Sequence, residues 1–214
     1  MQTTFWHQLW ANNEIGFHES KPNRLLVAYF EKLNLQARSR VFLPLCGKTL
    51  DIAWLLSQRV HVLGAELSET AVKQLFGDLG IDEPTITSCG ALTRHSAQNI
   101  DIYVGDIFDL SAEQLGAVDA IYDRAALVAL PEPIRSQYTQ HLVEITKSAS
   151  QLLITFDYDQ NQMDGPPFSI NADKVRSYYS NTYSVRPLES KTVPGKLKGK
   201  CEAEEQIWLL HKEA

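Results

Sequence analysis

The sequence lacks the cysteine and histidine patterns of disulfide-rich and zinc-binding proteins. Its 214 residues include three cysteines, which lie far apart and form no Cys-x-x-Cys pair: Cys46, Cys89 and Cys201. An odd and scattered set of this kind indicates neither a disulfide framework nor a zinc site. The six histidines also have no metal-ligand spacing. We therefore expect a protein without a metal ion, in a reducing compartment.

Long apolar runs and an excess of positive charge are missing as well. No stretch approaches the roughly 18 uninterrupted apolar residues of a membrane-spanning helix, and the first residues have no apolar segment flanked by positive charge. The net charge of −6 leaves no broad cationic surface for nucleic-acid phosphates or anionic lipids. These absences predict a cytoplasmic protein with neither a nucleic-acid nor a membrane partner.

What the sequence does contain is an alternation of short apolar runs with amphipathic segments. Hydrophobic residues make up 44% of the chain and charged residues 21%, which suits a single well-buried domain over residues 1–214. Apolar runs predict strands near 41–45, 60–63, 100–104, 118–122 and 152–156, with two closing strands at 183–188 and 206–210. The polar segment 82–98 predicts irregular chain with one short strand at most. This order indicates an α/β fold with a doubly wound, mostly parallel sheet.

The unit of strand, loop, helix and strand at 40–68 carries the clearest binding signal. Its first apolar run stops at Cys46 and Gly47, and Thr49 can cap the helix that follows. Glu66 lies 19 positions after Gly47, where the second strand is expected to end. A carboxylate there can accept hydrogen bonds from both ribose hydroxyls of an adenosine cofactor, and Gly47 lets the backbone approach a ligand closely. A tight turn followed by a solvated acid fits the same spacing, so both interpretations stay open.

The sequence of this loop can be compared with the motifs that bind different cofactors. Gly47-Lys48-Thr49 matches the end of a phosphate-binding loop, but Phe42 stands where that motif needs glycine. None of the eight tyrosines has a lysine four positions later, as a short-chain dehydrogenase would. A loop with one glycine and an acid after the second strand suits S-adenosylmethionine, whose amino-acid tail is smaller than a pyrophosphate. This last step is an analogy between folds.

Further charged residues follow the third and fourth predicted strands. Asp106 can accept a hydrogen bond from the amine of adenine while Ile107 packs on the ring, and it can equally cap a turn. Asp123 and Arg124 end the fourth strand, where they either contact a ligand or form a surface ion pair. All of these residues are expected at the same edge of the sheet as Gly47.

The N-terminal segment is dense in aromatic residues. Trp6 and Trp10 lie four positions apart and share one face of a helix. Such a helix either docks on the core or folds over a planar ligand. From this spacing alone we favour the docking helix.

Taken in order, these motifs make the whole chain resemble the thiopurine S-methyltransferase family. Each motif is short, but together they recur in the family's order and at similar separations. The resemblance rests on Trp6 and Trp10 with Gly16-Phe17-His18, and on the motifs at 43–48, 64–68, 106–110, 122–130 and 165–168.

The resemblance implies a monomeric, S-adenosylmethionine-dependent transferase with a seven-stranded Rossmann-like sheet and S-adenosylhomocysteine as product. Residues 1–35 then become a helical lid or cap, which reverses the preference for a docking helix. Phe17 becomes a wall of the acceptor pocket. The implied cofactor contacts are Trp10, Leu45, Glu66, Asp106, Ile107 and Arg124.

Two positions remain ambiguous under this resemblance. Arg124 serves either the carboxylate of the cofactor or an anionic acceptor. The segment 191–200 departs from the family pattern, in which arginine lies near the acceptor, so Lys196 or Lys198 would take that place.

The activity that the resemblance implies is S-methylation of aromatic and heterocyclic thiols of the thiopurine type, by in-line methyl transfer to a thiolate. We assign no catalytic residue and no general base, because alignment of the reactants is the main requirement of such a step. One alternative is methylation of small inorganic nucleophiles such as thiocyanate, halide, or selenium and tellurium species. Another is a non-catalytic protein that binds adenosine-type ligands.

Overall fold

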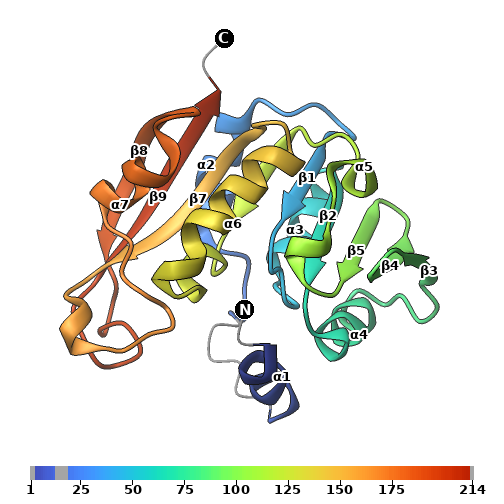
Figure 1. Cartoon of the computed structure of the whole chain (residues 1–214), viewed down its shortest axis with the longest axis horizontal. Helices are drawn as coiled ribbons and strands as arrows, with labels where there is room; N and C mark the ends of the chain where they lie inside the picture. Colours follow the sequence, from blue (N-terminus) through green and yellow to red (C-terminus); the bar gives the residue numbers. More distant parts are fainter. Residues whose placement is uncertain (1–2, 13–18, 213–214) are drawn as a thin grey trace.

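The structure is a computed structural model that describes residues 3–12 and 19–212. Within this part of the chain, nine strands form one sheet in the order β3-β4-β5-β2-β1-β6-β7-β9-β8 (Figure 1). The strands are β1 (Arg40–Leu43), β2 (His61–Glu66), β3 (Thr85–Cys89), β4 (Leu92–Ala97), β5 (Ile100–Val104), β6 (Ala120–Asp123), β7 (Ser150–Asp157), β8 (Tyr183–Thr192) and β9 (Glu204–Lys212).

Helices connect these strands. The α-helices are α1 (Thr3–Ala11), α2 (Arg24–Tyr29), α3 (Asp51–Ser57), α4 (Glu69–Asp78), α5 (Ala112–Leu115), α6 (Glu132–Ile145) and α7 (Ala172–Tyr179). The short 3-10 turns are η1 (Phe30–Leu33), η2 (Ile107–Asp109), η3 (Leu127–Ala129) and η4 (Gln160–Gln162).

The centre of the sheet is parallel and its outer strands are antiparallel. β5, β2, β1, β6 and β7 run in one direction, and β9 returns against β7 with Leu153 opposite Trp208. β1 lies at the centre of the sheet. The next strand in the chain, β2, pairs with one edge of β1, and β6 pairs with its other edge. In such sheets, ligands bind outside the carboxyl ends of the strands at the point where the strand order reverses in this way.

Both faces of the sheet are covered, which explains the nearly continuous apolar runs. Phe42 and Leu63 pack in a core that also holds residues of α5, α6 and α7. Val41 and Val62 pack in a second core, on the side of α2, α3 and α4. Neighbouring residues of each strand therefore face opposite layers, as the pleat requires. The predicted α/β fold with a doubly wound, mostly parallel sheet is confirmed.

The number of strands differs from the prediction of seven. The segment expected to be irregular forms the antiparallel hairpin β3–β4, which turns at Gly90 with a φ of 66° and joins the edge of β5. The side chains of β3 are exposed or half-buried, with Ile86 on the surface, whereas Leu92 and His95 of β4 are buried. Leu92 is the one fully buried apolar side chain of this hairpin, so hydrophobic patterning gave little sign of it.

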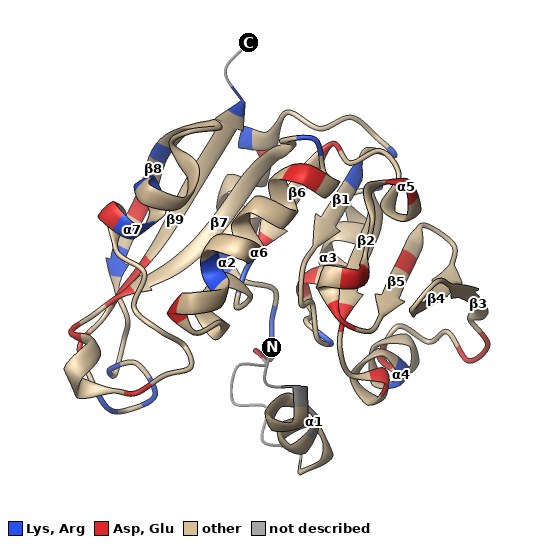
Figure 2. Ribbon diagram, in the orientation of Figure 1, with Lys and Arg blue, Asp and Glu red and all other residues tan. Residues whose placement is uncertain are grey.

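The outer surface mixes charges of both signs. Lysine, arginine and acidic residues are interspersed over the helices and strand ends seen in Figure 2. Among the described residues, no helix is long and apolar enough to cross a bilayer.

Candidate functional site

A cavity of about 680 Å³ opens at the carboxyl ends of the central parallel strands. Its walls come from α1, the loop after β1, the end of β2, the segment after β6, and the loops near 165–167 and 193–198. Figure 1 shows α1 below the lower edge of the sheet, apart from the helices that cover its faces. The volume lies in the range of pockets that enclose a small organic ligand.

The floor of the cavity is the turn that follows β1. Leu45 and Gly47 both have positive φ values, 48° and 55°, and the amide of Cys46 donates to the carbonyl of Ala65 at 2.9 Å. A side chain at position 64 would collide with this turn, because a Cβ on Gly64 would lie 2.9 Å from the Sγ of Cys46. The absence of a side chain at Gly64 thus lets the turn rest on β2.

Glu66 is the last residue of β2 and secures the same turn. Its Oε2 accepts from the amide of Gly47 at 2.8 Å, and its Oε1 accepts from the amide of Ser68 at 2.8 Å. Only 6% of the residue is exposed, and burial raises the pKa of this carboxyl, while the hydrogen bonds from Ser68 and Gly47 oppose the shift. Each carboxylate oxygen has a further lone pair. Glu66 can therefore hold the turn and accept bonds from a ligand in the cavity that it lines.

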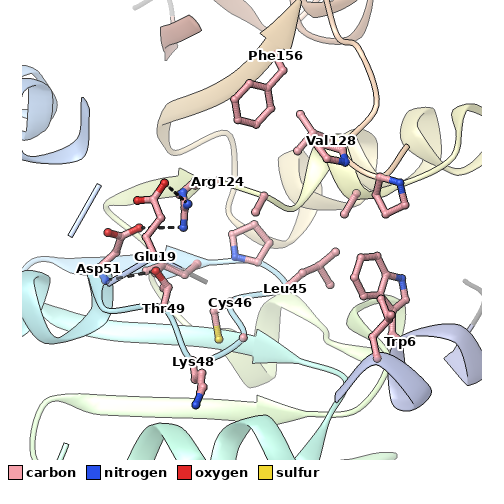
Figure 3. A pocket seen from close by; sticks show the side chains of 18 of the residues that line it. Trp6, Glu19, Leu45, Cys46, Lys48, Thr49, Asp51, Arg124, Val128 and Phe156 are labelled. Carbon is pink, nitrogen blue, oxygen red and sulfur yellow. Dashed lines mark hydrogen bonds and ion pairs between the residues drawn. The ribbon is translucent and has the colours of Figure 1, made fainter. Parts of the chain in front are cut away.

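Arg124, which follows β6, lies on another wall and contacts two acidic side chains (Figure 3). Its Nη2 is 2.7 Å from Oε1 of Glu19, and its Nη1 is 3.9 Å from Oδ2 of Asp51. The Asp51 carboxylate also accepts from the hydroxyl of Tyr122 at 2.9 Å and from the amide of Asn23 at 2.6 Å. The guanidinium thus contacts two distant parts of the chain, and one of its two partners, Asp51, is itself held by hydrogen bonds.

Asp123, the neighbour of Arg124, faces the core. It is fully buried, its Oδ1 accepts from the amide of Leu127 at 3.1 Å, and its Oδ2 accepts from the hydroxyl of Tyr138 at 2.8 Å. Desolvation raises the pKa of this carboxyl to about 6, against the effect of those two bonds. Neither sequence-based interpretation of Asp123 holds, because it is part of neither a surface ion pair nor the cavity lining.

The cavity beyond Arg124 is mainly apolar. Lys198 is the lysine of the pair considered above that lines it, and its Nζ donates to the carbonyl of Pro166 at 2.8 Å. Desolvation lowers the pKa of this ammonium group, with a further effect from Lys200. The apolar part of this wall is formed by Val128, Phe156, Pro166, Pro167, Val193 and Leu197.

The structure brings together four of the seven site residues predicted from the sequence. Trp10, Leu45, Glu66 and Arg124 line the cavity. Phe17 lies outside the described residues.

Asp106 and Ile107 follow β5 beside the end of β2 but do not line the cavity. The Oδ1 of Asp106 accepts from the amide of Phe108 at 3.1 Å and caps η2, and Ile107 is 1% exposed within the core. The turn-capping interpretation of Asp106 is therefore satisfied, and any contact with a ligand stays a prediction.

Sequence reasoning missed three residues that line the cavity near Arg124: Glu19, Asp51 and Tyr122. Their partners lie far away in the chain, so no local spacing marked them. The one available sign was an acid at position 51, at the start of a helix whose surroundings are otherwise apolar. Among the described residues, no three His, Cys, Asp or Glu side chains are placed to hold a metal ion.

Comparison with solved structures supports the fold. A methyltransferase from Burkholderia thailandensis, solved with 1,6-didemethyltoxoflavin and S-adenosylhomocysteine, aligns with a TM-score of 0.66 at 13% identity, over 98% of this chain and 87% of that one. An S-adenosylmethionine-dependent methyltransferase from Anabaena variabilis aligns with a TM-score of 0.64 at 15% identity, over 98% and 95% of the two chains.

Comparison of sequences supports a narrower assignment. A family model described as Thiopurine S-methyltransferase matches residues 1–213. A protein of that name from Xanthobacter autotrophicus is 51% identical over 99% of this chain and 100% of its own length. Another, from Acinetobacter baylyi, is 48% identical over 98% of each chain. The chain therefore belongs to the thiopurine S-methyltransferase family and is an S-adenosylmethionine-dependent methyltransferase.

Proposed function

We propose that this enzyme methylates the sulfur of aromatic and heterocyclic thiols of the thiopurine type, by in-line transfer. The observation that carries the proposal is a single cavity in which a hydrogen-bonding turn, at Gly47 and Glu66, adjoins an apolar wall with one lysine, Lys198. A flat apolar ring with an ionised sulfur suits such a wall. The names of the relatives support the same acceptor class.

The residues of the turn fit the cofactor. Glu66 has lone pairs for two ribose hydroxyls, and Gly47 permits close approach of the backbone. We propose Trp10, Leu45 and Arg124 as further contacts. Asp106 and Ile107 stay proposed contacts for adenine, at the end of the strand next to β2.

The protein mainly aligns the reactants in this proposal. S-adenosylmethionine supplies a methyl group on a positively charged sulfur, so a thiolate needs no further activation. The buried acids Asp51 and Glu66 are occupied by hydrogen bonds, and we assign no general base. Good alignment is worth roughly 7 kcal/mol or more in intramolecular models. The Lys198 ammonium favours an acceptor that is anionic.

The N-terminal part of the chain is proposed to cover the site. Trp6 and Trp10 of α1 line the cavity together with Phe5 and Leu9, and Trp10 is almost fully buried. We propose that residues 1–35 form a helical lid or cap on a single domain over 1–214, in which α1 covers the cavity and α2 anchors the segment in the second core, and that Phe17 adds an aromatic wall for the acceptor. We further propose a monomer that acts in the cytoplasm on small molecules, without a nucleic-acid or membrane partner.

The decisive experiment is methyl transfer from labelled S-adenosylmethionine to a thiopurine, thiophenol, thiocyanate and selenite. We expect turnover of the two aromatic thiols, because the apolar wall accommodates their rings. Turnover of thiocyanate or selenite alone would replace the proposal with methylation of inorganic nucleophiles. Calorimetric binding of S-adenosylhomocysteine with no turnover of any acceptor would contradict thiol methylation and leave a binding protein.

A further inference from the structure

Among the described residues, Glu19 and Asp51 both contact Arg124, and they differ in how freely they can move. Asp51 is 1% exposed and is held by hydrogen bonds from Tyr122 and Asn23. The side chain of Glu19 is 45% exposed, although its oxygen lies closer to the guanidinium, at 2.7 Å. Asp51 is therefore a fixed support for Arg124, and Glu19 is a partner that can leave at low cost.

The surroundings of Glu19 are rich in acids. Glu205 lines the same cavity, and its own side chain is 15% exposed and paired with Arg24 at 3.3 Å. Desolvation is the main reason why the pKa of Glu205 is raised. The charges of Arg24 and Arg124 lower this pKa, and the charge of Glu19 raises it. Glu19 and Glu205 are therefore close enough for their negative charges to repel each other.

Arg124 lines the same cavity as Glu66, the proposed contact for the ribose. β1 pairs with both β2 and β6, so the turn with Gly47 lies between Glu66 and Arg124. Thr49 and Asp51 continue the lining from that turn toward Arg124, as Figure 3 shows. An amino-acid tail that starts at the ribose and crosses the turn brings its carboxylate to Arg124, where Glu19 already presents the same chemical group.

We propose that Arg124 is a carboxylate-exchange subsite, in which Glu19 pairs with the guanidinium in the ligand-free protein and the carboxylate of the cofactor's amino-acid tail replaces it. Asp51 stays in place and keeps Arg124 aimed at the cavity. Glu19 then acts as an internal competitor that lowers the affinity for the cofactor. This inference rests on the proposed contact between Arg124 and the cofactor, but it does not depend on the identity of the methyl acceptor.

Calorimetry with two ligands tests the exchange. S-adenosylhomocysteine carries the tail carboxylate, and 5′-methylthioadenosine lacks it. Glu19→Gln and Glu19→Ala should each lower the Kd for S-adenosylhomocysteine by about two- to five-fold, as expected when a competing state that holds half or more of the molecules is removed. The Kd for 5′-methylthioadenosine should stay unchanged.

A matched control removes another exposed ion pair. Asp173 of α7 pairs with Arg176 at 3.4 Å, away from the cavity lining, and Asp173→Asn should alter neither Kd. Unchanged or weaker binding of S-adenosylhomocysteine by both Glu19 variants would overturn the proposal, as would an equal gain for both ligands. A fall only in the KM for an anionic thiol would also overturn it, because the competitor would then act on the acceptor. Failure of thiol turnover would leave this binding test intact.

Discussion

Glu66 and Asp123 are both the last residue of a parallel strand, and both are buried, yet they serve different parts of the molecule. Glu66 ends β2 on the side of the sheet that holds Val62, where it meets the turn at Gly47 and the cavity. Asp123 ends β6 on the opposite side, under Tyr138 of α6. The strand end alone therefore does not make an acid part of a binding site, because the pleat decides which layer the side chain enters.

Replacing Asp123 should produce the largest effect on stability. Asp123→Ala leaves the amide of Leu127 and the hydroxyl of Tyr138 without their acceptor in the core. At about 1–3 kcal/mol for each of the two buried unpaired groups, the free energy of unfolding should fall by about 2–6 kcal/mol in urea denaturation. Tyr138→Phe, which removes one donor, should cost less. A loss below about 1 kcal/mol for Asp123→Ala would show that Asp123 is not a structural support.

The pH dependence of stability should show the effect of burying Asp123. Burial raises its pKa from the ordinary value of 3.8 to about 6, so between these values the folded state holds a proton that the unfolded state has released. The free energy of unfolding contributed by this group is therefore highest below pH 4 and falls as the pH rises to 6, by roughly 3 kcal/mol.

Asp123→Asn provides the reference for this measurement, because it lacks the titrating group. The stability of the wild-type protein minus that of the variant should decrease between pH 4 and pH 6 in urea denaturation. A difference that is constant or increases over this range would contradict the assignment.

Replacing Glu66 should instead reduce binding. Glu66→Ala removes the proposed acceptor for the ribose hydroxyls, and the affinity for S-adenosylhomocysteine should fall by about 1.5–3 kcal/mol. Calorimetry on the folded variant measures this loss, and Glu66→Gln, which keeps one acceptor oxygen, should give an intermediate value. If the alanine variant binds as tightly as the wild-type protein, Glu66 supports the turn only.

The smallest effect is expected from metal removal. We assign Glu66 as a hydrogen-bond acceptor and not as a metal ligand, since the described residues contain no group of three metal-binding side chains around it. Dialysis against a strong chelator should leave both cofactor affinity and methyl transfer unchanged. Activity that is lost on chelation and restored by a divalent cation would contradict this view of Glu66.

The central strands were predictable because each is a short apolar run between helical patterns. The hairpin β3–β4 was not, because its strands have one fully buried apolar side chain, Leu92, and therefore leave a weak hydrophobic signal. In the site, the spacing from Gly47 to Glu66 marked the turn correctly. Asp106 was predicted at the edge of the sheet from the same kind of spacing, but the structure uses its carboxylate to cap η2.

The sequence by itself determined which residues follow each strand, since apolar runs and helix caps depend on near neighbours. It therefore identified the turn at Gly47, the acid at Glu66 and the arginine at position 124. The tertiary structure alone decided which face each strand-end side chain takes and which distant groups meet it. Asp51 accepts a hydrogen bond from Tyr122, which is 71 positions away in the sequence. Glu19 follows α1 and contacts Arg124, which follows β6. Such contacts arise only when packing brings separate segments together, because no local spacing encodes them.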